Sequence, residues 1–590
     1  MKKQFVFKRS NKGIDAKIRR TAAGLLALLL LICAAPPAAI EWFSAKAQAA
    51  APTSGECGAA VTWSYDPAAR ALTIGGTGAM QDYGSARLLE GGPSVTTAPW
   101  RPFYHEMQTV VIGDDVTSIG NSAFFGCDGI THLTLGTGVT RIGSNAFAGC
   151  AALPEIAIPS AVTAVDRLAF SGCTCLTNVK IDDLAAWCRI AFAGTYANPL
   201  FYAHRLCLNG AALQSLTIPD GVTSIGNYQF CGSEALTDVT IPAFVTDIGH
   251  GAFRGCTGLS AVTIPDSVTS VGQGAFSDCT GLRDVSVGAG VTSISNAMFS
   301  GCTGLTDVPA GSGVTRIEDN AFADCTGLTS IAMPVGVTFI GSRAFAGCAG
   351  AVRIAIPAGV TAVETEAFAG CIRVTEITVA AENPVYRSAG NCIIRTAGNE
   401  LTAGCKASVI PADGSVTRIG DNAFAGCTGL TSIAVPAGVT FIGSRAFAGC
   451  AGLTEIALPE SVTGIGVAAF ENCTGLTSMS VPGGVSAISA NMMKGCTALT
   501  SVAIPDGVTT IGEFAFRDCS GLTGISIPDS VESIGDQAFN GCASLAEITI
   551  PHSITSIGVR VFYGCGARRA FRSRTALKAS GTKRFWGAPR

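Results

Sequence analysis

Apolar and polar positions along the chain follow one pattern of 23 residues, which Leu259–Gly281 (LSAVTIPDSVTSVGQGAFSDCTG) shows clearly. The first residues alternate between apolar and polar, which predicts a short β-strand. This strand ends at Pro265, because proline has no N–H to donate to a neighbouring strand. A turn leads into a second short extended piece, Val268–Val271, and a tight helical or irregular turn follows around Phe276 and Cys279.

The pattern recurs almost from end to end. The element V-T-x-I-G or a close variant occurs in seventeen copies, which begin at Val116, Val139, Val162, Val222, Val245, Val268, Val291, Val314, Val337, Val360, Val416, Val439, Val462, Val485, Val508, Val531 and Ile554. Each copy is followed in the same register by Phe, except at Met493, and sixteen copies then carry Cys, with Ser233 as the exception. A fixed period of this length predicts a stacked repeat array, in which neighbouring coils share one continuous core.

These motifs, written LxxIxIPxxVTxIGxxAFxxC, resemble the BspA-like class of leucine-rich repeats, which occurs in bacterial cell-surface and secreted proteins. The resemblance covers about residues 55–565. It implies a β-rich repeat solenoid, right-handed, with coils of 23 residues, a parallel sheet on one face and short helical or irregular turns. It also implies a role in protein binding and adhesion.

Residues 1–49 are typical of an export signal. Eight Lys or Arg precede an apolar stretch at residues 22–35, and the sequence Ala47-Gln48-Ala49 predicts cleavage between Ala49 and Ala50. The alternative is an uncleaved anchor, which would then be the chain's contact with a membrane. The apolar stretch is short for a span and is followed at once by two prolines. We therefore expect a secreted or cell-surface bacterial protein.

Three further regions are predicted. Residues 50–112 lack the repeat and predict a β-hairpin, turning at Asp66-Pro67, that caps the open end of the solenoid. Residues 113–565 form the solenoid. Residues 566–590 contain eight Arg or Lys and no Asp or Glu. This composition indicates either a basic tail that contacts anionic wall polymer or membrane, or a disordered or out-of-frame end.

Two insertions, at about residues 174–212 and 372–410, interrupt the period. The second predicts a hairpin that turns at residues 397–399. Either insertion could be an enlarged repeat with its own local packing, which we favour, or a binding loop. Aromatic residues make the second interpretation worth testing, and the candidate contacts are Trp187, Tyr196, Tyr202 and Tyr386.

The formal net charge of −3 conceals an acidic body between two basic ends. Residues 50–565 carry 22 Lys or Arg against 40 Asp or Glu, a formal charge of −18. Nucleic-acid binding requires a basic face for the phosphates. The composition therefore argues against a nucleic-acid partner.

The 24 cysteines lie mostly on one column of the repeat. Stacked coils place parallel Cβ atoms about 4.8 Å apart, beyond the roughly 3.5–4.5 Å of a disulfide. We therefore interpret the column as small, buried, apolar filler. Cysteines off the column leave open a disulfide within either insertion. Zinc is disfavoured, because the chain has no C-x-x-C pair and only five His, and we expect no metal and no cofactor.

No arrangement of residues suggests catalysis, so we expect no enzyme and name no catalytic residue. The first strand of each coil instead offers a flat column of small outward residues as a candidate partner-binding face. This column comprises Thr217, Thr240, Thr263, Ser286, Ala332, Ala355, Thr378, Ala434, Ala457, Ser480, Ser526 and Thr549. The alternative is that Thr and Ser are merely good exposed strand residues.

Two functions remain open from the sequence. The first is protein–protein binding to extracellular or cell-surface proteins, in particular adhesion to host or microbial surfaces. The alternative is a structural spacer of the cell envelope that has no specific ligand. A near-identical internal duplication, Asp319–Gly350 and Asp421–Gly452, suits either role, because a modular array tolerates added coils.

Overall fold

The computed structural model describes residues 52–87, 94–309, 311–566 and 571–573. Two compact units are distinguished, Met1–Gly55 and Glu56–Arg590. The predicted export signal, its cleavage site at Ala49 and Ala50, and most of the predicted basic tail lie outside the described residues.

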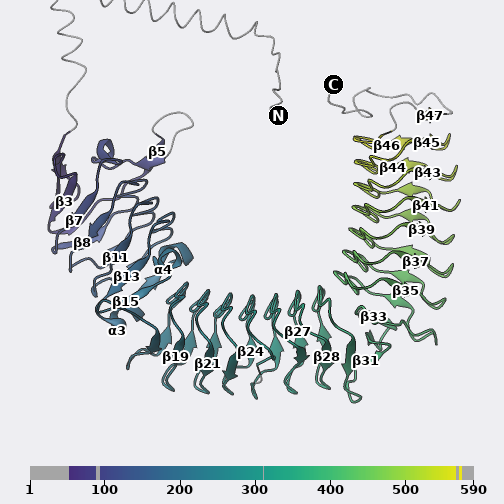
Figure 1. The fold of residues 1–590 in the computed structure, drawn as a ribbon, viewed down its shortest axis with the longest axis horizontal. Helices are drawn as coiled ribbons and strands as arrows, with labels where there is room; N and C mark the ends of the chain where they lie inside the picture. The colour runs from purple at the N-terminus through teal and green to yellow at the C-terminus, as the bar shows by residue number, and fades with distance from the viewer. Residues whose placement is uncertain (1–51, 88–93, 310, 567–570, 574–590) are drawn as a thin grey trace, which may run out of the picture. The chain divides into compact units, whose positions relative to one another are not determined.

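The second unit is a solenoid, and most of its coils contribute two short strands and a turn (Figure 1). We call the strands that carry the LxxIxI positions the first strands. They are β9 (His132–Thr134), β11 (Glu155–Ala157), β13 (Asn178–Ile181), β15 (Leu206–Leu208), β17 (Ser215–Thr217), β19 (Asp238–Thr240), β21 (Ala261–Ile264), β23 (Asp284–Val287), β26 (Ser330–Ala332), β28 (Arg353–Ile356), β30 (Glu376–Val379), β35 (Ser432–Ala434), β37 (Glu455–Ala457), β39 (Ser478–Ser480), β41 (Ser501–Ala503), β43 (Gly524–Ser526) and β45 (Glu547–Ile550).

The strands that carry V-T-x-I, together with β14 of the first insertion, which pairs in the same series, are called the second strands. They are β8 (Val116–Ile119), β10 (Arg141–Ile142), β12 (Ala164–Val165), β14 (Ala191–Phe192), β18 (Ser224–Ile225), β20 (Asp247–Ile248), β22 (Ser270–Val271), β24 (Ser293–Ile294), β25 (Arg316–Ile317), β27 (Phe339–Ile340), β29 (Ala362–Val363), β34 (Arg418–Ile419), β36 (Phe441–Ile442), β38 (Gly464–Ile465), β40 (Ala487–Ile488), β42 (Thr510–Ile511), β44 (Ser533–Ile534) and β46 (Ser556–Ile557).

Neighbouring coils pair their strands in parallel, with partners 23 residues apart in the regular repeats. In the first strands Val262 lies opposite Val285, and in the second strands Ile317 lies opposite Ile340. The predicted β-rich solenoid with 23-residue coils and parallel sheets is therefore confirmed. Among the residues that the structure describes, helix is confined to short pieces: η1 (Arg101–Phe103), α3 (Leu184–Cys188), η2 (Thr195–Ala197) and α4 (Leu200–Ala203).

Threonine recurs in the pattern because its hydroxyl joins one coil to the next. Thr338 Oγ1 donates to the Thr315 carbonyl at 3.1 Å, and Thr361 Oγ1 donates to the Thr338 carbonyl at 3.3 Å. A second series precedes the first strands, where Thr500 Oγ1 donates to the Thr477 carbonyl at 3.0 Å. Each bond is worth about 1 kcal/mol. Threonine at these positions thus favours the strand, because it is β-branched, and its hydroxyl also joins adjacent coils by a hydrogen bond.

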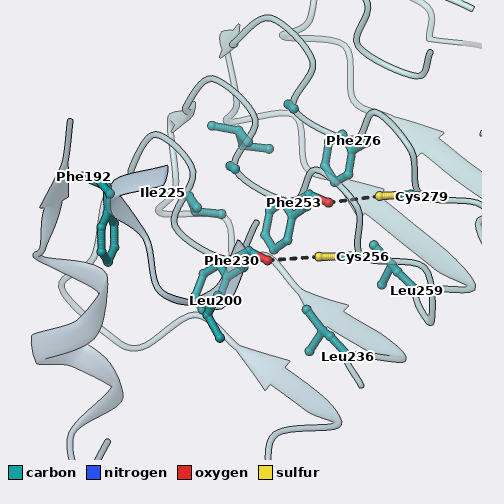
Figure 2. Close-up of a cluster of buried hydrophobic side chains, with 14 of the residues drawn as sticks. Phe192, Leu200, Ile225, Phe230, Leu236, Phe253, Cys256, Leu259, Phe276 and Cys279 are labelled. Atoms are coloured by element: carbon teal, nitrogen blue, oxygen red, sulfur yellow. Dashed lines mark hydrogen bonds between the residues drawn. The ribbon is translucent and has the colours of Figure 1, made fainter. Parts of the chain in front are cut away.

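The core contains a column of phenylalanine rings flanked by the cysteine column (Figure 2). Phe230, Phe253 and Phe276 are buried, and successive ring centroids lie 5.5 and 5.3 Å apart. Cys256 Sγ donates to the Phe230 carbonyl at 3.3 Å, and Cys279 Sγ donates to the Phe253 carbonyl at 3.1 Å. The thiol therefore does more than fill space, because its S–H also donates a weak hydrogen bond to the preceding coil.

The N-terminal hairpin forms from the predicted segments. Strands β2 (Val61–Asp66) and β3 (Ala71–Gly76) are antiparallel, and β3 pairs in parallel with β7 (Thr109–Ile112), which pairs with β9. The hairpin thus covers the edge of the first-strand series. The remaining strands near this end are β1 (Ser54–Glu56), β4 (Gly78–Ala79), β5 (Ser85–Arg87) and β6 (Ser94–Thr96), and β47 (Phe571–Ser573) pairs with β45 at the other end.

The turn of most coils holds a left-handed residue two positions before the Phe. Leu168 has φ +60° and is 36% exposed, whereas the equivalent position is glycine at Gly251 and Gly274. Left-handed backbone costs an L-residue with a Cβ roughly 1–2 kcal/mol.

We expect Leu168→Gly to raise the free energy of unfolding by about 0.5–1 kcal/mol in urea denaturation, after the opposing backbone entropy of glycine is included. Leu168→Ala is the control, because it shortens the side chain but keeps the Cβ. A glycine variant no more stable than the alanine variant would refute this explanation.

Candidate partner-binding surface

The predicted column of small residues lies on the outward side of the first strands. Eleven of its twelve residues are exposed, and Ala355 is half-buried. The parallel register places column members side by side: Thr217 lies opposite Thr240, and Thr263 lies opposite Ser286. The same holds within the groups Ala332–Ala355–Thr378, Ala434–Ala457 and Ser526–Thr549, and Ser480 lies opposite Ala503. Adjacent members are thus separated by one strand spacing of about 4.8 Å.

A second outward column, two residues earlier on each first strand, carries charge that the sequence analysis did not single out. Asp238 and Asp284 are exposed members of this column. Within this column Arg353 pairs with Glu376 at 3.0 Å. Near its start Glu155 pairs instead with Lys180, whose Nζ lies 2.6 Å from Glu155 Oε1 and which stands opposite Ala157 in the neighbouring column of small residues. The alternation of side chains along a strand would have identified this charged column from the sequence, because residues two apart point to the same side. The face therefore combines a flat row of small side chains with a parallel row of mixed charge.

The first insertion brings Trp187 into the core rather than to the surface. Trp187, on α3, is 1% exposed, and Asp183 caps this helix by accepting from the Ala186 N–H at 3.0 Å. The indole Nε1 donates to the Gln229 carbonyl at 3.1 Å, and Gln229 Nε2 donates back to the Trp187 carbonyl at 2.5 Å. Asn198 Nδ2 donates to the same Gln229 carbonyl at 3.2 Å. The prediction that Trp187 is a surface contact is therefore wrong.

Tyr386 in the second insertion is also an interior residue. It is 1% exposed, and its hydroxyl accepts from the Val363 N–H at 3.0 Å. Val363 belongs to β29, which ends a group of paired second strands, so the tyrosine hydroxyl satisfies an N–H that the next strand would otherwise bind. As a surface contact Tyr386 is likewise a wrong prediction. The predicted hairpin is present as β32 (Cys392–Arg395) and β33 (Glu400–Ala403), preceded by β31 (Tyr386–Ala389).

Tyr196 and Tyr202 are the two candidates that reach the surface. Tyr196 is 44% exposed and Tyr202 is half-buried, and both pack on Phe201 with ring centroids 4.9 and 5.2 Å away. The structure therefore brings two of the four insertion aromatics together in one small cluster. Trp187 contacts Gln229, 42 residues later, and Tyr386 contacts Val363, 23 residues earlier. Neither contact can be read from the local sequence, and for this reason the prediction of surface positions is wrong for both side chains.

The interior role of Trp187 gives a prediction. Trp187→Phe keeps most of the apolar volume but removes the indole donor, and we expect it to lower the free energy of unfolding by about 1–2 kcal/mol. Tyr196→Phe, at an exposed position in the same insertion, should stay within about 0.5 kcal/mol of wild type. Urea denaturation followed by circular dichroism measures both. Equal effects of the two variants would contradict the assignment of Trp187 to the core.

The described cysteines are free thiols, and burial raises the pKa of most of them. Desolvation raises the pKa of Cys173 to about 12 and that of Cys473 to about 12. These thiols are therefore protonated at neutral pH and poor nucleophiles. Within the ranges the structure describes, no group of three His, Cys, Asp or Glu could hold a metal ion. A search of the same ranges found no helix long and apolar enough to cross a membrane.

Comparison with known proteins agrees with this geometry. A family model for the BspA type leucine rich repeat region, with six copies, matches residues 103–198, 204–329, 305–390, 395–523 and 509–587. No curated protein matches the chain.

Several solved structures resemble the chain. A leucine-rich repeat protein from Eubacterium ventriosum is 19% identical, covers 90% of this chain and 98% of its own, and gives a TM-score of 0.34. A leucine rich cell surface protein from Faecalibacterium prausnitzii is 23% identical over 85% and 95%, with a TM-score of 0.32. The leucine rich repeat protein of T. pallidum is 32% identical over 32% and 89%, with a TM-score of 0.27. The matched residues span most of the solenoid, and the chain belongs to the BspA-type leucine-rich repeat family.

Proposed function

We propose that the protein is exported and binds extracellular or cell-surface proteins through the outward face of its first strands, as an adhesin for host or microbial surfaces. The observation that carries the proposal is the exposed column of small residues. Its members lie one strand spacing apart, and their short side chains leave the backbone of the sheet accessible to a partner. Membership of a family of leucine-rich repeat surface proteins supports the same role.

The chemistry of the face sets what it can recognise. Hydroxyls of Thr240, Thr263 and Ser286 can donate and accept hydrogen bonds, and Asp238 and Asp284 beside them favour a basic partner surface. The column of small side chains is flat, so affinity would come from many modest contacts over a broad area. A rigid array suits such binding, because its surface does not have to be ordered on association.

Binding of the full chain to a panel of extracellular-matrix proteins and neighbouring-cell envelopes, under reducing conditions, tests the proposal. We expect a saturable partner whose affinity falls at least about tenfold in the triple variant Thr240→Arg, Thr263→Arg, Ser286→Arg, because three long side chains would hold the partner off the sheet. The matched control, Ser270→Arg, Gln273→Arg, Ala289→Arg, adds the same charge at exposed positions outside the first strands and should bind as wild type.

The structural spacer is the competing function, and the same experiment separates the two. A spacer gives no saturable partner across the panel while circular dichroism shows the array folded. Equal loss of binding in both triple variants would also reject the first-strand face, because it would point to charge rather than to the surface itself.

A further inference from the structure

The turns around Gly251 and Gly274 differ from those of the other coils. Most coils carry a side chain at this left-handed position, but these two successive coils have glycine, with φ +55° and +62°. A Cβ on Gly251 would lie 2.8 Å from Cδ1 of Tyr228, the equivalent residue of the preceding coil. Glycine is therefore required at this position, because the tyrosine ring lies over its backbone.

The space over Gly274 is open, in contrast to that over Gly251. Apart from the two residues that adjoin it in the chain, only side-chain atoms of Ser277 lie within 4 Å of the position that its Cβ would take. A hollow of about 580 Å³ results, and Tyr228 and Ala297 line it from the coils on either side of the two glycines.

A buried hydroxyl in this hollow is an independent indication of a ligand. Ser277 is 7% exposed, and its Oγ has no hydrogen-bond partner among the described residues. The Oγ atom lies 3.3 Å from the position of a Cβ on Gly274, so the hydroxyl faces the hollow. Other coils have alanine at the position of Ser277, for example Ala323 and Ala346. An unpaired hydroxyl in the interior is costly, so the site favours a ligand that forms a hydrogen bond with it.

Three further polar side chains line the hollow: His250, Arg254 and Asp278. Arg254 Nε donates to Asp278 Oδ2 at 3.2 Å, so the two charges balance. The terminal guanidinium nitrogens and Asp278 Oδ1 have no partner in the described part of the chain. His250 Nδ1 accepts from the Gln273 N–H at 3.0 Å, so in the neutral ring the proton is on Nε2, which is a further free donor.

We propose that this hollow binds a neutral pyranose unit of a glycan. The face of a sugar ring that presents C–H groups packs against the Tyr228 ring, because aromatic faces attract such groups. Its hydroxyls form hydrogen bonds with Ser277 and with the paired Arg254 and Asp278, since adjacent hydroxyls match the two-pronged geometry of a guanidinium or a carboxylate.

The lining of the hollow favours a neutral sugar over other ligands. Its charged side chains are paired with each other, so the hollow does not select an anion or a cation. No aliphatic side chain larger than alanine lines it, so an apolar peptide side chain would gain little burial there. The hollow belongs to the turns and not to the first strands, and the proposal does not depend on the function proposed for the first-strand face.

Binding of the full-length protein to immobilised neutral oligosaccharides is the first part of the test. The probes end in glucose, galactose, mannose or N-acetylglucosamine. We expect saturable binding to at least one probe, and the triple variant Thr240→Arg, Thr263→Arg, Ser286→Arg should retain it. Absence of saturable binding to every probe would overturn the proposal. Loss of binding in the triple variant would also overturn it, because the sugar would then lie on the first-strand face.

Substitutions of the tyrosine test the stacking contact. Tyr228→Ala should weaken binding of the best probe at least about tenfold, whereas Tyr228→Phe keeps the ring and should bind within about threefold of wild type. Tyr228 is only half-buried, so both variants should fold, and circular dichroism checks this. Equal affinities of the two variants would contradict the proposal.

Filling the hollow gives the matched comparison. Gly274→Asn should lower the affinity at least about tenfold, because the amide occupies the place of the sugar. Asparagine holds the same left-handed position at Asn320 and Asn491, with φ +56° at both, so the turn accommodates it. Ala468→Asn makes the same change at this position in a coil outside the hollow and should bind as wild type. Equal affinities of the Gly274→Asn and Ala468→Asn variants would overturn the proposal.

Discussion

The protein should unfold cooperatively on mild alkalinisation, at about pH 9–10. Burial raises the pKa of the cysteine column, for example to about 12 at Cys325 and at Cys519. In the unfolded chain the thiols ionise near pH 8.5. Below that pH both states hold the proton and the thiols contribute nothing to the pH dependence. Above it the unfolded state releases protons that the folded state keeps, so stability falls by about 1.4 kcal/mol per pH unit for each thiol.

The number of buried thiols makes this effect large. Eighteen described cysteines have a raised pKa, and together they would remove roughly 25 kcal/mol per pH unit once the unfolded thiols are fully ionised. Typical domains are stable by only about 5–15 kcal/mol. Circular dichroism against pH, in reducing and oxygen-free buffer, measures the transition.

A variant with fewer thiols is the control for alkaline unfolding. Replacing Cys256, Cys302, Cys325 and Cys371 by Ala removes four of these groups and should make the fall of stability with pH shallower by about a fifth, even though the cavities lower stability at pH 7. Stability that is unchanged up to pH 11 would mean that the thiols are exposed or joined as disulfides, since disulfide sulfurs do not titrate.

Phe276→Ala should lower the free energy of unfolding by about 3–5 kcal/mol. Phe276 is 0% exposed, and its ring lies between those of Phe253 and Phe299 at centroid distances of 5.3 and 5.8 Å. The substitution removes the burial of one ring, two stacked contacts and the packing of both neighbours. Because each coil contacts only the next, the damage should concentrate in the adjoining coils.

A surface phenylalanine of the same array is the matched control. Phe339 lies on a second strand, is only half-buried, and has the Arg316 guanidinium 3.9 Å above its ring centroid. Phe339→Ala should cost about 1 kcal/mol or less, since it loses only this exposed cation–π contact and part of its burial. Urea denaturation of both variants makes the comparison. Similar losses would show that the stacked column does not dominate the core.

The period of the sequence was sufficient to predict the strands and the core columns, because each coil repeats the same contacts with its neighbours. Deviations from the pattern are explained by the coil that precedes them. Ser233 replaces Cys directly after the first insertion, where no Phe carbonyl of a regular coil lies 26 residues earlier to accept the thiol. The duplicated segments show the same dependence. Cys325 Sγ donates to the Phe299 carbonyl at 3.0 Å, but its counterpart Cys427 reaches only Gly404 at 3.8 Å, because the second insertion precedes it.

The insertions could not be predicted in the same way. Trp187 is buried by Gln229, which lies 42 residues later, and no local pattern links the two. Tyr386 replaces a missing strand contact of Val363, and this role depends on how the insertion folds back. The interruption of the second strands between β14 and β18 likewise follows from the count of strands in the two series, which the sequence alone did not reveal.

The central claim is that the outward face of the first strands binds a protein. Hydrogen exchange on the full chain, with and without a partner identified by the binding panel, tests it most directly. We expect the footprint to fall on the first strands and the residues beside the small-residue column, in particular on β17, β19, β21 and β23, while the turns that carry the phenylalanines are unchanged. A footprint confined to the turns or to the second strands would contradict the account and place the binding surface elsewhere on the solenoid.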